Sequence, residues 1–313
     1  AAQKGEVMPA FEVTRWVTQK QISPKALKDR PYVVEFWATW CPPCRESVPH
    51  LAEMNSRYEP LGLVMVGLTS EPADKIEAIR RFAEQYKMNY YVGLNDELGG
   101  KLKVEGIPHA VVVGRDGRIA WQGHPMSPEF EPAAVQALAE WLFPEERFAA
   151  AAGPARQVVA GAGKEALANL RKLADAAETR GPAGEALKVL EKAAQARAKA
   201  AEESDEGPVA RVLALEQVAE EYEGLAAANE ALAKAAAIRA AETQKDPAFA
   251  DEVSARSQHR KAAADLKRDA ARASGEQGRQ AQLRAILAAL EKAAAAYDAI
   301  LERYPRTKAA SDV

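Results

Sequence analysis

The sequence predicts an α/β domain with a mixed sheet and flanking helices over residues 1–148, followed by an all-helical domain over residues 149–313. All five tryptophans and both cysteines precede residue 148, whereas alanine supplies about a third of the residues after it. The first half alternates short apolar runs with amphipathic segments, which is typical of strands alternating with helices. A chain of 313 residues also has room for two domains of about 150 residues each.

The first half contains the periodic segments that such a sheet requires. The apolar runs predict strands over residues 32–37, 63–68, 90–92, 110–113 and 119–121. The amphipathic segments predict helices over residues 43–58, 73–86 and 132–143. Asp116-Gly117 suits the positive φ of a tight turn, so the last two strands are expected to form a hairpin.

The second half consists of strong helix formers interrupted at a few points. The interruptions are Gly181-Pro182, Gly207-Pro208, Asp246-Pro247 and Gly275. The pattern Leu215-x-x-Val218-x-x-x-Tyr222 reappears as Tyr297-x-x-Ile300-x-x-x-Tyr304, with a fainter copy that starts at Leu173. These offsets suggest a helical-hairpin repeat of roughly 41 residues, similar to tetratricopeptide-type units. Chance similarity between alanine-rich helices is the alternative.

Composition excludes several classes of protein. The net charge of -3 gives no basic excess for nucleic acid, so no nucleic-acid partner is expected. No stretch reaches the roughly 18 consecutive apolar residues of a membrane helix. The chain starts at Ala1-Ala2 without a Met, as a cleaved export signal or an engineered start would leave it.

The motif Cys41-Pro42-Pro43-Cys44 predicts the chemistry. It follows a predicted buried strand and opens a predicted helix. The free N–H groups and the positive dipole end of a helix N-terminus stabilise a thiolate. We therefore expect Cys41, at the exposed start of the helix, to attack a partner disulfide, and the more buried Cys44 to resolve the mixed disulfide. The two prolines suit the first helical turn, where a missing N–H costs nothing.

A zinc site and a purely structural disulfide are the alternative interpretations of the cysteine pair. A zinc site needs two more ligands, and the four histidines offer no second pair at ligand spacing. A purely structural disulfide across so short a loop would add little stability. We therefore expect redox chemistry with no metal and no cofactor.

Three segments of the first half carry a family resemblance. Residues 34–45, Val-Glu-Phe-Trp-Ala-Thr-Trp-Cys-Pro-Pro-Cys-Arg, resemble the active-site signature of the TlpA/ResA-like thioredoxins. Residues 104–108 resemble the segment that carries the family's cis-proline, and residues 111–119 resemble the following strand and hairpin. The resemblance covers about residues 5–145 and implies a thioredoxin-like fold. It also implies an exported, often membrane-tethered disulfide reductase, a class of which several members serve cytochrome c maturation.

Glu35 lies six residues before Cys41, inside an otherwise apolar strand. A carboxyl group there would be desolvated, which would raise its pKa and allow it to exchange a proton with Cys44. The resemblance places the family's buried acid at this position. An edge-strand glutamate that faces water is the alternative.

The resemblance further implies a cis bond between Ile107 and Pro108. This bond would present the backbone of Ile107 to an extended partner segment beside Cys41; an ordinary trans turn is the alternative. His109 either tunes the thiolate electrostatically or points into solvent. Trp40 is expected to shield one side of Cys41. The residues assigned to substrate binding are Trp40, Pro42, Pro43, Ile107 and His109.

The sequence therefore predicts an exported, periplasmic or otherwise extracytoplasmic thiol–disulfide oxidoreductase, most simply a reductase of protein disulfides. Its expected partners are protein dithiols or disulfides and a thiol electron donor, for which a membrane protein is one option. The helical domain is expected to bind a protein partner, with dimerisation or a spacer role as the alternative. An oxidase or isomerase on the same fold, and a helical-repeat scaffold with a secondary redox domain, are the rival functions.

Overall fold

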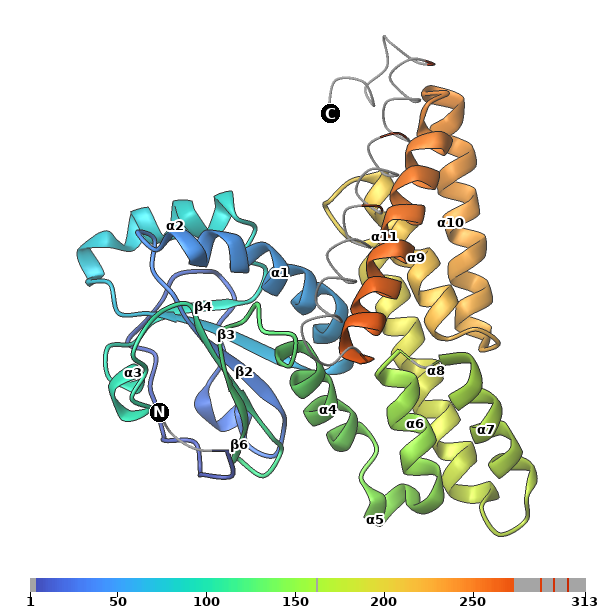
Figure 1. The fold of residues 1–313 in the computed structure, drawn as a ribbon, viewed down its shortest axis with the longest axis horizontal. Coiled ribbons are helices and arrows are strands. Elements are labelled where there is room, and N and C mark those ends of the chain that lie inside the picture. The colour runs from blue at the N-terminus through green and yellow to red at the C-terminus, as the bar shows by residue number, and fades with distance from the viewer. Residues whose placement is uncertain (1–3, 162, 273–287, 289–294, 296–302, 304–313) are drawn as a thin grey trace. The chain divides into compact units, whose positions relative to one another are not determined.

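A computed structural model describes residues 4–161 and 163–272, together with residues 288, 295 and 303 (Figure 1). Contacts along the chain divide it into two compact units, Ala1–Arg197 and Ala198–Val313. The division falls inside helix α8 (Arg180–Glu202). The domain boundary predicted between residues 148 and 149 lies earlier, directly after helix α5 (Glu145–Phe148), and stays a prediction.

In the described part of the first unit, a mixed sheet has the strand order β1-β4-β3-β2-β5-β6. The strands are β1 (Arg15–Trp16), β2 (Tyr32–Phe36), β3 (Val64–Thr69), β4 (Tyr91–Leu94), β5 (His109–Val113) and β6 (Ile119–Gly123). β2 pairs in parallel with β3 and antiparallel with β5, so it lies in the middle of the sheet. The prediction of a mixed sheet is confirmed. β1 was not predicted, because two residues are too few to show a period.

Alternate residues of the strands face opposite sides of the sheet. The side of β2 that presents Tyr32, Val34 and Phe36 packs against helix α3 (Leu98–Lys101) and the N-terminal segment around Phe11. Every residue of β2 is buried, because strands lie on both edges and apolar layers on both faces. The segment that follows β2 and leads into helix α1 (Pro42–Tyr58) is therefore anchored on a fully buried strand.

The other face of the sheet carries helices α1 (Pro42–Tyr58), α2 (Ile76–Gln85) and α4 (Phe130–Leu142). The ring of Trp37, just after β2, stacks on that of Phe82 from α2, with centroids 4.9 Å apart. The hydroxyl of Tyr58 donates to Glu131 across 3.0 Å, which joins α1 to α4. These helices begin and end within two residues of the predicted ones, apart from α2, which a short 3-10 turn precedes.

Further helices complete the described part of the first unit. They are α6 (Ala152–Val159), α7 (Gly163–Asp175) and the greater part of α8, with short 3-10 turns at Pro24–Leu27, Glu59–Leu61, Ala73–Lys75 and Ala149–Ala151. The predicted hairpin is present, with Gly117 at φ 74° in the turn between β5 and β6. No helix of the described residues is long and apolar enough to cross a membrane.

The second unit is helical, as predicted for this part of the chain. Besides the end of α8, its described helices are α9 (Pro208–Glu221), α10 (Ala226–Lys245) and α11 (Phe249–Arg272). The predicted breaks at Gly207-Pro208 and Asp246-Pro247 coincide with the boundaries of these helices, and Gly181-Pro182 lies in the first turn of α8. The break at Gly275 and the Tyr297, Ile300 and Tyr304 copy of the pattern lie outside the described residues. The repeat therefore stays a prediction.

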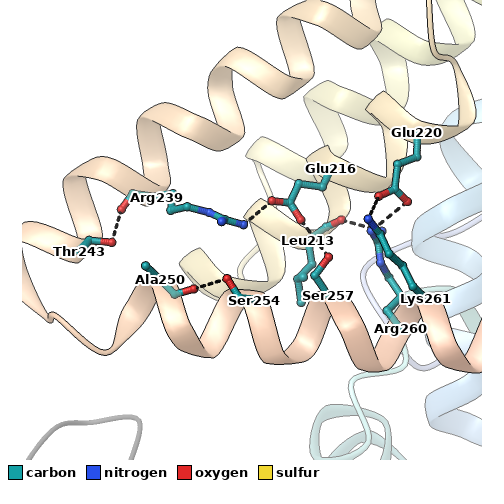
Figure 2. A network of polar contacts seen from close by, with 10 residues as sticks. All are labelled: Leu213, Glu216, Glu220, Arg239, Thr243, Ala250, Ser254, Ser257, Arg260 and Lys261. Atoms are coloured by element: carbon teal, nitrogen blue, oxygen red, sulfur yellow. Dashed lines mark hydrogen bonds and ion pairs between the residues drawn. The ribbon is translucent and has the colours of Figure 1, made fainter. Parts of the chain in front are cut away.

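Figure 2 shows the polar contacts that join α9, α10 and α11. Glu216 of α9 accepts from Arg239 of α10 and, across 3.4 Å, from Ser257 of α11. Arg260 of α11 donates to Glu220 of α9 across 3.2 Å and to the carbonyl of Leu213 across 3.0 Å. These charge-assisted contacts therefore link all three helices, beside a core that includes Leu215, Val218 and Val253.

Candidate functional site

The two cysteines lie at the start of α1. Cys41 is the N-cap residue of this helix, and Cys44 lies in its first turn, after Pro42 and Pro43. The backbone N–H of Cys44 donates to Sγ of Cys41 across 3.2 Å. The two sulfur atoms are joined in a disulfide with an S–S distance of 2.05 Å. The helix N-terminus thus directs an N–H group at the sulfur expected to be the nucleophile, an arrangement that favours a thiolate there after reduction.

The expected exposure of Cys41 is wrong for the disulfide form. Cys41 is 2% exposed and Cys44 is fully buried, so accessibility separates them only slightly. The carbonyl oxygen of Ile107 lies 3.7 Å from Sγ of Cys41 and covers it from the side of the sheet. The surface at this point is formed instead by Trp40, which is 67% exposed, and by the exposed rings of Pro42 and Pro43.

The peptide bond between Ile107 and Pro108 is cis, which confirms the prediction for this bond. Pro108 directly precedes β5, whose pairing with β2 aligns His109 with Phe36. That register carries the Ile107 carbonyl to the end of the sheet where β2 leads into α1. The sheet thereby brings Ile107 beside Cys41, although the two residues are 66 positions apart in the sequence.

Glu35 is fully buried in the central strand β2, so the alternative of a water-facing glutamate on an edge strand is excluded. Burial raises the pKa of its carboxyl group to about 8, although a hydrogen bond from Tyr90 acts in the opposite direction. The hydroxyl of Tyr90 donates to Oε2 of Glu35 across 2.8 Å. Tyr90 was not among the predicted site residues. Its only signal was its place at the start of a weak strand candidate.

A second carboxyl group organises the loop that leads into Cys41. Glu71, just after β3, accepts from the backbone N–H of Thr39 and from its hydroxyl, each across 2.7 Å. Arg45 of α1 donates to the carbonyl of the same threonine across 3.0 Å. The turn from β2 to the dithiol is therefore held on two sides by charged groups. Sequence reasoning missed Glu71, because nothing local distinguishes it from a solvated glutamate.

His109 was expected either to tune the thiolate electrostatically or to point into solvent. It is half-buried at the start of β5, and its Nε2 lies 3.3 Å from Oε1 of Gln122 on β6. Its ring centroid lies 6.4 Å from that of Phe36. Burial lowers the pKa of His109, and the hydrogen bond with Gln122 opposes that effect. Its side chain thus packs on the strands beside the cis bond rather than pointing freely into solvent.

Among the described residues there is no group of three or more His, Cys, Asp or Glu side chains placed to hold a metal ion. The arrangement around Cys41 contains what thiol–disulfide exchange requires: a disulfide at a helix N-terminus, a buried acid and a backbone carbonyl beside the sulfur.

Comparison with known proteins agrees with this chemistry. Residues 3–138 match the Redoxin family. The thiol-disulfide oxidoreductase ResA of Bacillus cereus is 30% identical over 120 residues, which cover 37% of this chain and 67% of that protein. ResA of Bacillus anthracis is 29% identical over 122 residues, which cover 38% of this chain and 69% of that protein. The chain belongs to the ResA-type thiol–disulfide oxidoreductases.

The solved structures include a thioredoxin-family thiol:disulfide interchange protein from Chlorobium tepidum. It has 24% sequence identity and a TM-score of 0.38, and the match covers 44% of this chain and 99% of that one. All these similarities concern the part of this oxidoreductase that contains the dithiol. The protein is thus a redox enzyme that acts on protein thiols, with a thioredoxin-like domain in its first half.

Proposed function

We propose that this oxidoreductase works as a reductase of protein disulfides through Cys41 and Cys44. The observation that carries the proposal is the position of the Cys41–Cys44 disulfide at the N-terminus of α1, six residues after the buried acid Glu35 of the central strand β2. A dithiol at this position has a stabilised thiolate for attack, and a buried carboxyl group can move the second proton.

In the proposed cycle the reduced enzyme attacks first through Cys41. Its thiolate forms a bond to one sulfur of the partner disulfide, and the other partner sulfur leaves as a thiolate. Cys44 then attacks Sγ of Cys41, so that the Cys41–Cys44 bond forms and the bond to the partner breaks. The partner disulfide gains two electrons and the enzyme dithiol loses two. A thiol electron donor returns the enzyme to the dithiol form.

Glu35 is proposed to exchange a proton with Cys44 during the second attack. Cys44 is fully buried, so its thiol has no contact with bulk water through which to lose a proton. The raised pKa of Glu35, about 8, places its titration near the pH range in which such exchange is efficient.

The partner is proposed to bind as an extended segment beside the cis bond. The Ile107 backbone lies next to the reacting sulfur, and Trp40, Pro42 and Pro43 offer exposed apolar surface around it. His109 borders the same segment. This combination suits a polypeptide with apolar residues next to its disulfide.

The working compartment and the physiological partners are also proposals. The resemblance to exported reductases supports an extracytoplasmic, for example periplasmic, location, where disulfides of proteins are common substrates. It also supports a membrane protein as the electron donor and a contribution to cytochrome c maturation. The helical second unit is proposed to bind a protein partner rather than to take part in the chemistry.

The direction of the reaction is tested by the reduction potential of the Cys41–Cys44 pair, equilibrated with glutathione. A potential of about -270 mV is expected of a reductant, whereas a value of about -120 mV would identify an oxidase. The assignment of the nucleophile is tested on the reduced protein by alkylation near pH 7 and mass spectrometry. Cys41 is expected to react much faster than Cys44, and preference for Cys44 would overturn the assignment.

A further inference from the structure

The buried carboxyl group of Glu35 is reached from a strand that is not its neighbour. Glu35 lies on β2, and Tyr90 directly precedes β4, while β3 runs between the two strands. The hydroxyl of Tyr90 nevertheless lies 2.8 Å from Oε2 of Glu35, so the tyrosine ring crosses over β3. Both side chains are almost completely buried, at 0% and 1% exposure.

Gly67 makes this crossing possible. It is the residue of β3 that pairs with Glu35 in the parallel ladder and lies between Glu35 and Val92. A Cβ atom on Gly67 would lie 3.0 Å from Cε2 of Tyr90 and 3.1 Å from Nε1 of Trp37. A side chain at this position would therefore push the tyrosine ring away from β2. The absence of a side chain creates the space through which the hydroxyl reaches the acid.

The contact uses one of the two carboxyl oxygens of Glu35. Oε2 accepts from Tyr90, whereas Oε1 is buried with no hydrogen-bond partner among the described residues. A hydrogen bond to a carboxylate favours the charged form, whereas burial disfavours it. The titratable group that meets Glu35 from the β4 side is Tyr90. Helix α1, on the same face of the sheet, carries Cys44 in its first turn. β3 contributes only Gly67, and α2 places Phe82 on Trp37.

We propose that Tyr90 is a positioning residue for Glu35: its hydroxyl, crossing β3 at Gly67, holds Oε2 and leaves Oε1 for proton exchange with Cys44. This inference rests on the proposed role of Glu35. In the resolving step the thiol proton of Cys44 passes to the Glu35 carboxylate, and the Cys44 sulfur forms its bond to Cys41. The partner leaves as a thiolate. Tyr90 supports this step by keeping part of the Glu35 population charged near neutral pH.

The resolving step is measured on the full-length reduced protein with one equivalent of 5,5′-dithiobis(2-nitrobenzoate). The first thionitrobenzoate is released when Cys41 forms the mixed disulfide, and the second when Cys44 resolves it. The rate of the second release, followed from pH 5 to pH 10, reports the base that accepts the proton. In Tyr90→Phe the rising limb of this profile is expected to move up by about one pH unit, because the donor to the carboxylate is lost. The rate at pH 7 is then expected to fall about ten-fold and to recover at high pH.

Two further variants make the test specific. Tyr91→Phe is the matched control, because Tyr91 is the next residue and its ring contacts Trp16 rather than Glu35. Its profile is expected to match that of the unaltered protein. Gly67→Ala is expected to shift the limb in the same direction as Tyr90→Phe, by a smaller amount, because the added methyl group displaces the tyrosine ring. Circular dichroism in the near ultraviolet establishes that each variant is folded.

Combination with Glu35→Gln separates this inference from the proposed function. If Glu35 is the base, Glu35→Gln removes the limb, and adding Tyr90→Phe then changes nothing further. If Glu35→Gln leaves the profile unaltered, the proposed role of Glu35 fails, and the inference fails with it. If Glu35→Gln removes the limb but Tyr90→Phe behaves like Tyr91→Phe, only the inference is overturned. A pH-independent slowing in Tyr90→Phe would also overturn it, since that would indicate a packing role.

Discussion

At the scale of single residues, the position of Glu35 shows how strongly burial controls chemistry. The carboxyl group of Glu35 lies on a fully buried strand and has lost its hydration, so its neutral form is favoured. Burial raises the pKa of Glu35 to about 8, and the hydrogen bond from Tyr90 only partly opposes this. The group that is useful for proton exchange is therefore also a cost to folding above mildly acidic pH.

This cost predicts a specific dependence of stability on pH. The folded-state pKa of Glu35 is raised from its ordinary 4.5 to about 8. The raised pKa thus causes no loss of stability below about pH 4.5, and stability falls as the pH rises from there toward about 8. In Glu35→Gln this decline is expected to be absent, a difference on the order of a few kcal/mol between the two ends of the window.

Urea unfolding of the disulfide form at pH 5, 6.5 and 8 measures this prediction. Glu53→Gln is the control, because Glu53 is an exposed residue of α1, and its pH dependence should follow that of the unaltered protein. Parallel declines for Glu35→Gln and the unaltered protein would show that Glu35 keeps an ordinary titration in the folded state.

At the scale of secondary-structure elements, the loop between β2 and α1 depends on a residue of another strand. Thr39 donates twice to Glu71, which also accepts from the hydroxyl of Thr69 at the end of β3 across 3.3 Å. The carboxylate thereby fixes the turn two residues before Cys41 and beside the exposed Trp40. Helix α1 supplies the second restraint through Arg45, so the turn is fixed before any partner binds.

Removal of this carboxylate is expected to loosen the turn. Glu71→Ala leaves the half-buried N–H of Thr39 without its acceptor, which should reduce the free energy of unfolding by about 1–3 kcal/mol. Reduction of insulin should also become several-fold slower, because Cys41 is held less firmly. Glu71→Gln is expected to retain most of both properties, since its amide oxygen can accept from the N–H and its amide nitrogen can donate to the hydroxyl.

Chemical denaturation and the turbidity assay of insulin reduction provide the two measurements. Glu77→Ala serves for comparison, because Glu77 is exposed and pairs with Arg80 one turn along the same helix. If Glu71→Ala and Glu77→Ala change the free energy of unfolding and the rate of insulin reduction equally, Glu71 does not restrain the turn.

At the scale of the whole molecule, the chemistry and the alanine-rich helices are expected to be separable. All the residues proposed to act in catalysis precede residue 148, and they lie within the unit Ala1–Arg197. The second unit is held together by its own contacts, such as those of Glu216 and Glu220 with α10 and α11 (Figure 2). If these helices serve recognition, none of their residues needs to lie at the dithiol.

Two truncated chains test this separation. A chain that ends at residue 197 is expected to reduce insulin at close to the full-length rate and to lose preference for its physiological partner. A chain that ends at residue 148 should do the same if the predicted boundary is correct. Loss of insulin reduction by a folded chain of residues 1–197 would show that the second unit shapes the active site.

The sequence by itself determined the elements and the reacting groups of this oxidoreductase. Periodicity predicted the main strands and helices, Asp116-Gly117 predicted the hairpin, and Cys41-Pro42-Pro43-Cys44 predicted the dithiol at a helix start. Each of these signals is local, because helix and strand periods and turn preferences extend over only a few neighbouring residues. Glu35 was conspicuous as a charged residue inside an apolar run, and the family resemblance supported its role and added the cis bond before Pro108.

Only the tertiary structure decided which groups surround those residues. Tyr90 reaches Glu35 across 55 residues of sequence, and Glu71 reaches Thr39 across 32. Both contacts depend on the strand order, which places β3 and β4 beside β2, and the first depends also on the missing side chain of Gly67. Apolar periodicity shows that a strand is buried but not which strand lies next to it, since many orders bury the same apolar faces. The strand order of the folded sheet is therefore what identifies Tyr90 as the partner of Glu35 and Glu71 as the partner of Thr39.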